Sequence, residues 1–67
     1  MVKLENREYE GKLFFGLEFE NHHEVVYLET EKLREKAIKN YKKGKVAYSY
    51  KRDYFKGLPF YTELNFN

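Results

Sequence analysis

Apolar and polar residues alternate with a period of two near both ends of the chain, which is the spacing of a strand with one apolar face. The clearest N-terminal example comprises four apolar residues at every second position: Leu13, Phe15, Leu17 and Phe19. A weaker alternation predicts an earlier strand over residues 2–9, and Glu10-Gly11 has the composition of a hairpin turn between the two. A short apolar run predicts a third strand over residues 24–28.

The middle of the chain has the spacing of an amphipathic helix. Its apolar stripe comprises four residues: Leu33, Ala37, Ile38 and Tyr41. Thr30 is a suitable N-cap, because its hydroxyl oxygen can accept from the free backbone N–H groups of the first turn. Gly44 stands where a left-handed residue commonly ends a helix. These signals predict one helix from Glu31 to Lys43.

Two further strands are predicted after the helix. In the first, Val46, Tyr48 and Tyr50 recur at every second position. Pro59 lacks an N–H group and is expected to interrupt pairing, so residues 57–59 are predicted as a loop. Strict alternation in the last strand places four residues on one face and three on the other: Phe60, Thr62, Leu64 and Phe66 against Tyr61, Glu63 and Asn65.

The element order βββαββ predicts an α+β fold, in which a small antiparallel β-sheet carries one α-helix packed on one face. The pattern leaves the strand order open. A meander of the N-terminal strands that curls into a partly open barrel is the alternative. Because the chain has 67 residues and no linker or repeat, residues 1–67 are expected to form a single compact domain.

Aromatic residues make up 19% of the chain, which is more than one helix-on-sheet layer needs. Several rings are therefore expected on the outer face of the sheet or in loops, where exposed apolar area commonly marks a contact surface. The candidates for these exposed positions are Phe14, Tyr48, Tyr50, Tyr54, Phe55 and Tyr61. The alternative is that the tyrosines only pave the outer sheet as cross-strand pairs.

The two halves of the chain differ in charge. Residues 1–30 hold three basic side chains and seven glutamates, whereas residues 31–67 hold ten basic and four acidic side chains. The helix lysines form either a phosphate-facing ridge or the solvated side of an amphipathic helix. The basic C-terminal half is therefore the part of the chain in which a polyanion would find most of its contacts.

Rings and cations are interleaved most densely in residues 48–56. This run and one later ring supply the candidate partner-binding residues: Tyr48, Tyr50, Lys51, Arg52, Tyr54, Phe55, Lys56 and Tyr61. Tyrosine and arginine are enriched in the energetic centres of protein interfaces. The same mixture also suits single-stranded nucleic acid, where rings stack on bases and cations follow phosphates. An ordinary strand with a solvated turn is the third interpretation.

We expect a non-enzymatic binding module that contacts a protein partner through this aromatic and basic surface. Its size and composition resemble those of small phage-encoded proteins that block a host factor, so an inhibitor or adaptor from a mobile element is the expected role. Pairing of two copies into a homodimer is a variant of this hypothesis. The alternative is a nucleic-acid-binding protein that uses tyrosine stacking and Lys/Arg phosphate contacts.

Residues for catalysis or metal binding are few. The sequence has no cysteine, and Ser49 has no accompanying His–Asp arrangement, so no enzyme is expected. His22 and His23, between Glu20 and Glu24, are the only grouping that suggests a metal. Adjacent histidines in a turn point apart and do not have zinc-site spacing, so neither a metal nor another cofactor is expected.

The sequence also gives an expectation for location. No stretch approaches the roughly 18 apolar residues of a membrane span. The N-terminal residues lack the apolar core of a signal peptide. Because the absence of cysteine fits a reducing compartment, the expectation is a cytoplasmic protein without membrane contact.

Overall fold

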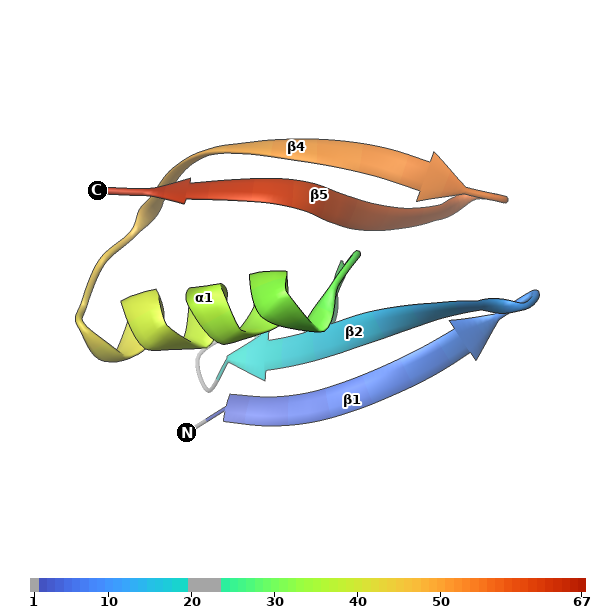
Figure 1. The fold of residues 1–67 in the computed structure, drawn as a ribbon, viewed down its shortest axis with the longest axis horizontal. Coiled ribbons are helices and arrows are strands. Elements are labelled where there is room, and N and C mark those ends of the chain that lie inside the picture. The colour runs from blue at the N-terminus through green and yellow to red at the C-terminus, as the bar shows by residue number, and fades with distance from the viewer. Residues whose placement is uncertain (1, 20–23) are drawn as a thin grey trace.

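The computed structural model describes residues 2–19 and 24–67. Its elements follow the order βββαββ (Figure 1). They are β1 (Val2–Tyr9), β2 (Lys12–Phe19), β3 (Val26–Leu28), α1 (Glu31–Lys42), β4 (Ala47–Phe55) and β5 (Leu58–Phe66). The expected α+β fold is confirmed: among the described residues, five strands form one sheet, and α1 packs on it.

The sheet is mixed and open. Its strand order is β1-β2-β3-β5-β4, and neighbouring strands are antiparallel except for β3 and β5, which are parallel and meet at Leu28 and Tyr61. The helix connects β3 to β4, which lies at the far edge of the sheet. The β4–β5 hairpin then places β5 next to β3. The sheet is therefore not wholly antiparallel. It does not close into the alternative barrel either, because β1 and β4 remain as edges.

Both hairpins turn through residues with positive φ. Glu10 and Gly11 have φ values of 48° and 87°, and Lys56 and Gly57 have values of 49° and 88°, as a type I′ turn requires. The Glu10-Gly11 turn agrees with the prediction. The loop predicted over residues 57–59 is right for Gly57, which lies in the second turn, but wrong for Leu58 and Pro59, which belong to β5. Pro59 lies inside β5, opposite Tyr54 of β4. The proline is tolerated because β3 pairs with β5 at Tyr61, beyond Pro59, so no described strand on that side requires its N–H group.

The predicted capping signals define α1. The Thr30 hydroxyl oxygen accepts a hydrogen bond of 3.1 Å from the Leu33 backbone N–H. At the other end, the Gly44 backbone N–H donates to the Tyr41 carbonyl over 3.0 Å, and Gly44 has a φ of 74°. A left-handed residue at this position is most easily glycine, so the helix ends where the sequence predicts.

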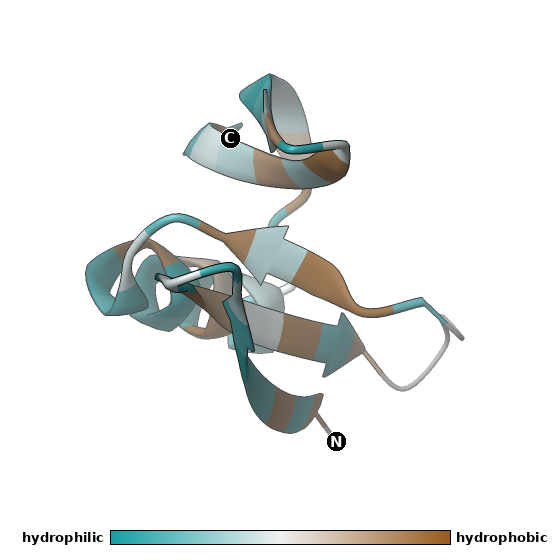
Figure 2. Ribbon diagram, turned by 90° about the vertical axis from the view of Figure 1, so that its right-hand side faces the viewer, coloured by the Kyte–Doolittle hydropathy of each residue, from teal (hydrophilic) through white to brown (hydrophobic). Residues whose placement is uncertain are grey.

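The main core lies between α1 and the sheet. Leu17 of β2, Leu28 of β3 and Ala37 of α1 are buried at its centre. Partly buried residues around them come from α1 and from four of the strands: Val2, Phe19, Val26, Leu33, Ile38, Tyr61, Leu64 and Phe66. The apolar stripe of the helix therefore covers the face of the sheet that the alternation in β2 predicts. Figure 2 shows apolar and polar residues alternating along the strands.

A register irregularity in β5 changes which rings reach this core. Lys51 pairs with Glu63, whereas the next residue, Arg52, pairs with Tyr61, so Thr62 is an extra residue in β5. An extra residue in one strand changes the side of the sheet to which the side chains beyond it point. Tyr61 consequently packs in the main core with Leu64, and Phe60 points to the opposite face. The predicted face is therefore right for Leu64 and Phe66, which both pack against the main core, but wrong for Phe60.

A second cluster of rings fills the sheet face opposite the helix. Its residues, here called the aromatic cluster, are Tyr9, Phe14, Tyr27, Phe55 and Phe60. Phe14 is fully buried, and its ring centroid lies 5.0 Å from that of Phe60. The Lys12 ammonium lies 4.7 Å from the Phe60 ring centroid and helps cover the cluster. The expectation of an exposed Phe14 is therefore wrong, because the outer rings bury one another.

Candidate partner-binding surface on β4

The candidate residues lie mainly on β4, which forms one edge of the sheet. Three of the candidate rings expose more than half of their surface: Tyr48 (66%), Tyr50 (57%) and Tyr54 (58%). An edge strand has a neighbour on one side only, so these rings have no adjacent strand to pack against on the other side. Their exposure agrees with the expectation from the aromatic surplus.

Side-chain alternation divides β4 into two faces. Tyr50 stands edge-on to Tyr61 of β5, with ring centroids 5.1 Å apart. Two residues further along, the Arg52 guanidinium lies 5.6 Å from the Tyr54 ring centroid. Tyr50, Arg52 and Tyr54 therefore occupy one face of the edge strand, where rings and a cation adjoin as the interleaved sequence of residues 48–56 predicts.

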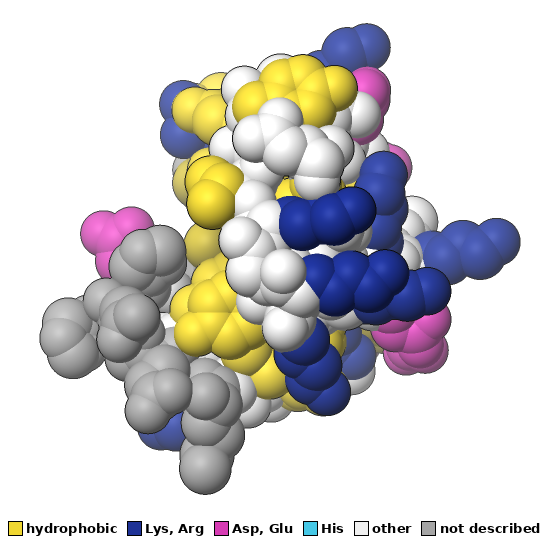
Figure 3. Space-filling view, turned by 90° about the vertical axis from the view of Figure 1, so that its left-hand side faces the viewer, with side chains coloured by type: hydrophobic (Ala, Val, Ile, Leu, Met, Phe, Trp, Pro, Cys, Tyr) yellow, Lys and Arg dark blue, Asp and Glu magenta, His cyan; other side chains and the backbone are white. Residues whose placement is uncertain are grey.

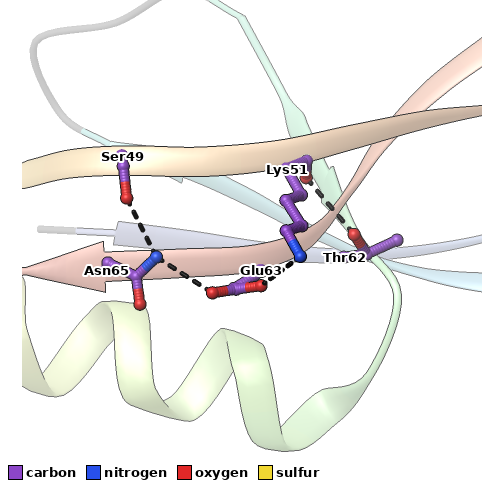
Figure 4. Close-up of polar contacts among 5 residues, drawn as sticks. All are labelled: Ser49, Lys51, Thr62, Glu63 and Asn65. Atoms are coloured by element: carbon purple, nitrogen blue, oxygen red, sulfur yellow. Dashed lines mark hydrogen bonds and ion pairs between the residues drawn. The ribbon is translucent and has the colours of Figure 1, made fainter.

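Lys51 belongs to the other face, where it joins a polar network (Figure 4). Its ammonium lies 3.5 Å from a carboxylate oxygen of Glu63. The other Glu63 oxygen accepts a hydrogen bond of 3.0 Å from the Asn65 side-chain amide, which also donates to the Ser49 hydroxyl oxygen over 2.9 Å. The Asn65 hydrogen bond and, after it, the Lys51 charge lower the pKa of Glu63 below the ordinary glutamate value. The positive charge of Lys51 thus has an acidic partner.

Phe55 and Lys56 lie at the tip of the β4–β5 hairpin, beside the tip of the β1–β2 hairpin. The Phe55 ring packs against Tyr9 and Phe14, with centroid distances of 6.4 Å and 5.9 Å, and is half-buried. The Lys56 ammonium lies 3.8 Å from a carboxylate oxygen of Glu10. Both residues therefore join the two hairpins, and the predicted exposure of Phe55 is wrong.

Asp53 occupies one of the backbone hydrogen-bond donors of β4. Its carboxylate accepts a hydrogen bond of 2.7 Å from the backbone N–H of Tyr54. A donor that is satisfied within the strand is not free to pair with an incoming strand. The accessible features of this edge are therefore the side chains of Tyr48, Tyr50, Arg52 and Tyr54, which we call the β4 surface.

An apolar groove borders the β4 surface on the helix side and was not foreseen from the sequence. It has a volume of about 390 Å³ and runs between the C-terminal half of α1 and the β4–β5 hairpin. Leu17, Leu28 and Ala37 line it from the main core, and Tyr50 and Tyr61 line it from the hairpin. Tyr61, predicted to be an exposed partner-binding ring, is instead a half-buried residue of this lining. The groove depends on the spacing of hairpin and helix, which no local pattern encodes.

Lysine side chains gather beside apolar side chains at the end of the molecule where α1 ends (Figure 3). Lys36 is tied to β5, because its ammonium donates a hydrogen bond of 3.3 Å to the Leu64 carbonyl. The described ion pairs involve Lys51 and Lys56 and no lysine of the helix. The helix lysines therefore form a solvated basic face, as an amphipathic helix ordinarily has.

The structure also describes some of the residues considered for catalysis or metal binding, among them Ser49 and Glu24. Within residues 2–19 and 24–67, no group of three or more acidic or histidine side chains could hold a metal ion. Glu20, His22 and His23 lie outside the described residues. Ser49 accepts the amide hydrogen bond of Asn65. In the part of the chain that the structure describes, no helix has the length and apolar character needed to cross a membrane.

Comparison with known proteins identifies no relative. No family model matches the sequence, and neither curated proteins nor solved structures show a significant match to this chain.

Proposed function

We propose that this protein is a non-enzymatic binding module that contacts a protein partner through the β4 surface. The observation that carries the proposal is the exposure of Tyr48, Tyr50 and Tyr54 on one edge strand. Tyrosine offers a large contact area at a low cost in side-chain entropy, and it is enriched among the residues that dominate interface energetics. Arg52, held over Tyr54, adds a planar cation that can pair with a carboxylate of the partner.

Recognition in this proposal is by side chains rather than by addition of a strand. Strand addition needs a row of free backbone donors and acceptors along an edge. The Asp53 carboxylate already accepts a hydrogen bond from the backbone N–H of Tyr54, near the C-terminal end of the exposed stretch. A partner would therefore seat the tyrosine rings in its own pockets, and by doing so it would be blocked from its usual ligand. This occlusion is the action expected of a cytoplasmic inhibitor or adaptor of the phage type.

The nucleic-acid alternative has weaker support because acidic residues are interspersed with the cations. Two of the three candidate cations already have carboxylate partners, Lys51 at 3.5 Å from Glu63 and Lys56 at 3.8 Å from Glu10. A phosphate backbone approaching these lysines would meet the two carboxylates as well. Among the candidate cations, Arg52 alone has no carboxylate within ion-pair distance, and one such contact gives little affinity for a polyanion.

The test is an affinity capture followed by measurement with purified components. Captured proteins are identified, purified and titrated against the wild-type chain and against a Tyr50→Ala/Tyr54→Ala variant. Loss of two interface anchors should weaken binding by about a hundredfold. Leu13→Ala is the control, since Leu13 is an exposed apolar residue on β2, away from β4. Equal losses in the two variants would contradict the proposal.

A parallel titration with single-stranded DNA and RNA at low and near-physiological salt separates the alternatives. If the proposal is correct, single-stranded DNA and RNA should not bind in a manner that depends on Arg52 and weakens steeply with added salt. Micromolar binding that is weakened by Arg52→Ala and by added salt would favour the nucleic-acid function instead.

A further inference from the structure

The apolar groove is an opening into the main core. Leu17 and Ala37, each 2% exposed, line it together with the fully buried Leu28. Tyr50 and Val46 lie at its rim and are 57% and 71% exposed. Sites for small organic molecules are concave and mostly apolar, with volumes of about 300–1,000 Å³. The volume of about 390 Å³ lies at the lower end of that range.

The lining is apolar except at one end. Lys45 is the charged residue among the described residues that line the groove. It follows Lys42 and Lys43, and all three side chains are exposed. The described ion pairs include none of these lysines. The groove therefore joins an apolar body to a positively charged mouth, and Figure 3 shows the same juxtaposition of apolar and basic side chains at this end of the molecule.

We propose that this groove binds a small amphipathic anion, a molecule with an apolar aromatic or aliphatic body and one carboxylate or sulfonate group. The body would lie against Val46, Tyr50 and Tyr61, and the anionic group would face Lys45. A polyanion fits poorly, because the lining beyond Lys45 offers no further cation. A neutral apolar molecule would fill the same volume without the contribution of Lys45. The site is independent of partner binding through β4, apart from Tyr50, which borders both surfaces.

Two fluorescent probes with the same ring system test both parts of the proposal. Anilinonaphthalene sulfonate carries one sulfonate, and N-phenylnaphthylamine is its neutral counterpart. We expect the sulfonate probe to saturate at one equivalent and to bind more tightly than the neutral probe. Lys45→Gln should weaken binding of the sulfonate probe by about threefold, as suits an exposed ion pair, and should leave the neutral probe unchanged.

Three further variants locate the site. Ala47→Phe adds a ring at the groove wall and should abolish binding of both probes. Lys32→Gln is the charge control, because Lys32 is exposed near the start of α1 and is not part of the lining. Tyr54→Ala, which removes a ring of the β4 surface outside the groove, should leave both probes bound. Circular dichroism and the urea midpoint establish that each variant is folded.

Three results would overturn the proposal. The first is equal affinity of the two probes together with indifference to Lys45→Gln. The second is binding that persists in Ala47→Phe or continues beyond one equivalent, since it would report apolar surface elsewhere. The third is a dimer in sedimentation equilibrium that Ala47→Phe dissociates, because a second copy of the chain would then occupy the groove.

Discussion

Arg34 of α1 donates a hydrogen bond of 2.7 Å from Nη1 to the side-chain oxygen of Asn6 on β1. The same nitrogen donates to the Gly16 carbonyl over 3.3 Å, and the guanidinium lies 5.3 Å from the Phe15 ring centroid. Arg34 is only 7% exposed, so a cation is held under the helix by neutral acceptors and a ring. This contact links α1 to the edge strand β1, whose neighbour in the sheet is β2.

Replacing Arg34 by methionine should destabilise the fold by about 1–3 kcal/mol, because it keeps an apolar stem but leaves Asn6 and the Gly16 carbonyl without their donor. Urea unfolding followed by circular dichroism measures the effect. Lys32→Met is the control, since Lys32 is an exposed cation on the same helix. Equal midpoints for the two variants would show that the buried guanidinium contributes nothing to stability.

Gly16→Ala should destabilise the protein strongly. A Cβ atom at this position would collide with the backbone oxygen of Glu5 on the paired strand β1 and would stand 3.0 Å from the Val25 side chain. A backbone oxygen cannot move without disturbing the β1–β2 ladder, so the two strands must separate locally. Glu18→Ala on the same face of β2 provides the comparison in thermal unfolding. A melting temperature of Gly16→Ala that matches that of Glu18→Ala would refute the close approach of the two strands.

Phe14→Ala should cost about 3–5 kcal/mol, since it empties the centre of the aromatic cluster. Tyr54→Ala should change stability by less than about 0.5 kcal/mol, because its ring is largely in solvent. The urea midpoints of the two variants give this contrast directly. A larger loss for Tyr54→Ala than for Phe14→Ala would mean that the cluster and the exposed surface have been interchanged.

Glu63 should titrate below the ordinary glutamate pKa, because the Asn65 amide and the Lys51 ammonium favour its charged form. A lowered pKa in the folded state contributes stability above the unfolded-state pKa, and this contribution is lost as the pH falls through the folded-state value. NMR titration of the side-chain carboxyl carbon measures the midpoint. Asn65→Ala should raise it more than Lys51→Met does, and an unchanged midpoint in both variants would rule out the network as its cause.

Local chemistry made the helix predictable. The Thr30 cap, the apolar stripe and Gly44 each act on parts of the helix a few residues away, and each has its predicted role. The Glu10-Gly11 turn was predictable for the same reason. The burial of Arg34 was missed, although its spacing from Ala37 and Ile38 places it on the apolar side of the helix.

The side of the sheet to which each β5 side chain points was not predictable, because it depends on how β5 pairs with β4. The extra residue at Thr62 appears only in the register between β4 and β5. It sends Phe60 to the aromatic cluster and Tyr61 to the groove, and alternation alone assigns both to the wrong face. The burial of Phe14 and Phe55 likewise requires β1, β2, β4 and β5 to be brought together.

The candidate surface was predicted in part. Tyr48, Tyr50 and Tyr54 are exposed as expected, since alternation and the edge position leave them without a covering element. Lys51 and Phe55 project to the other face of β4, which a count of rings and cations along the sequence does not reveal. Whether the exposed residues bind a partner stays a prediction.

The position of β5 has a consequence for how the protein folds. This last strand lies in the interior of the sheet, between β3 and β4, so the centre of the sheet depends on residues 58–66. Pairing Leu28 with Tyr61 requires a long loop to close before the contact is gained, which slows folding relative to helical proteins of this size. The N-terminal meander is then a weak folding unit by itself. Refolding should proceed in one cooperative phase, with β3 and β5 acquiring hydrogen-exchange protection together.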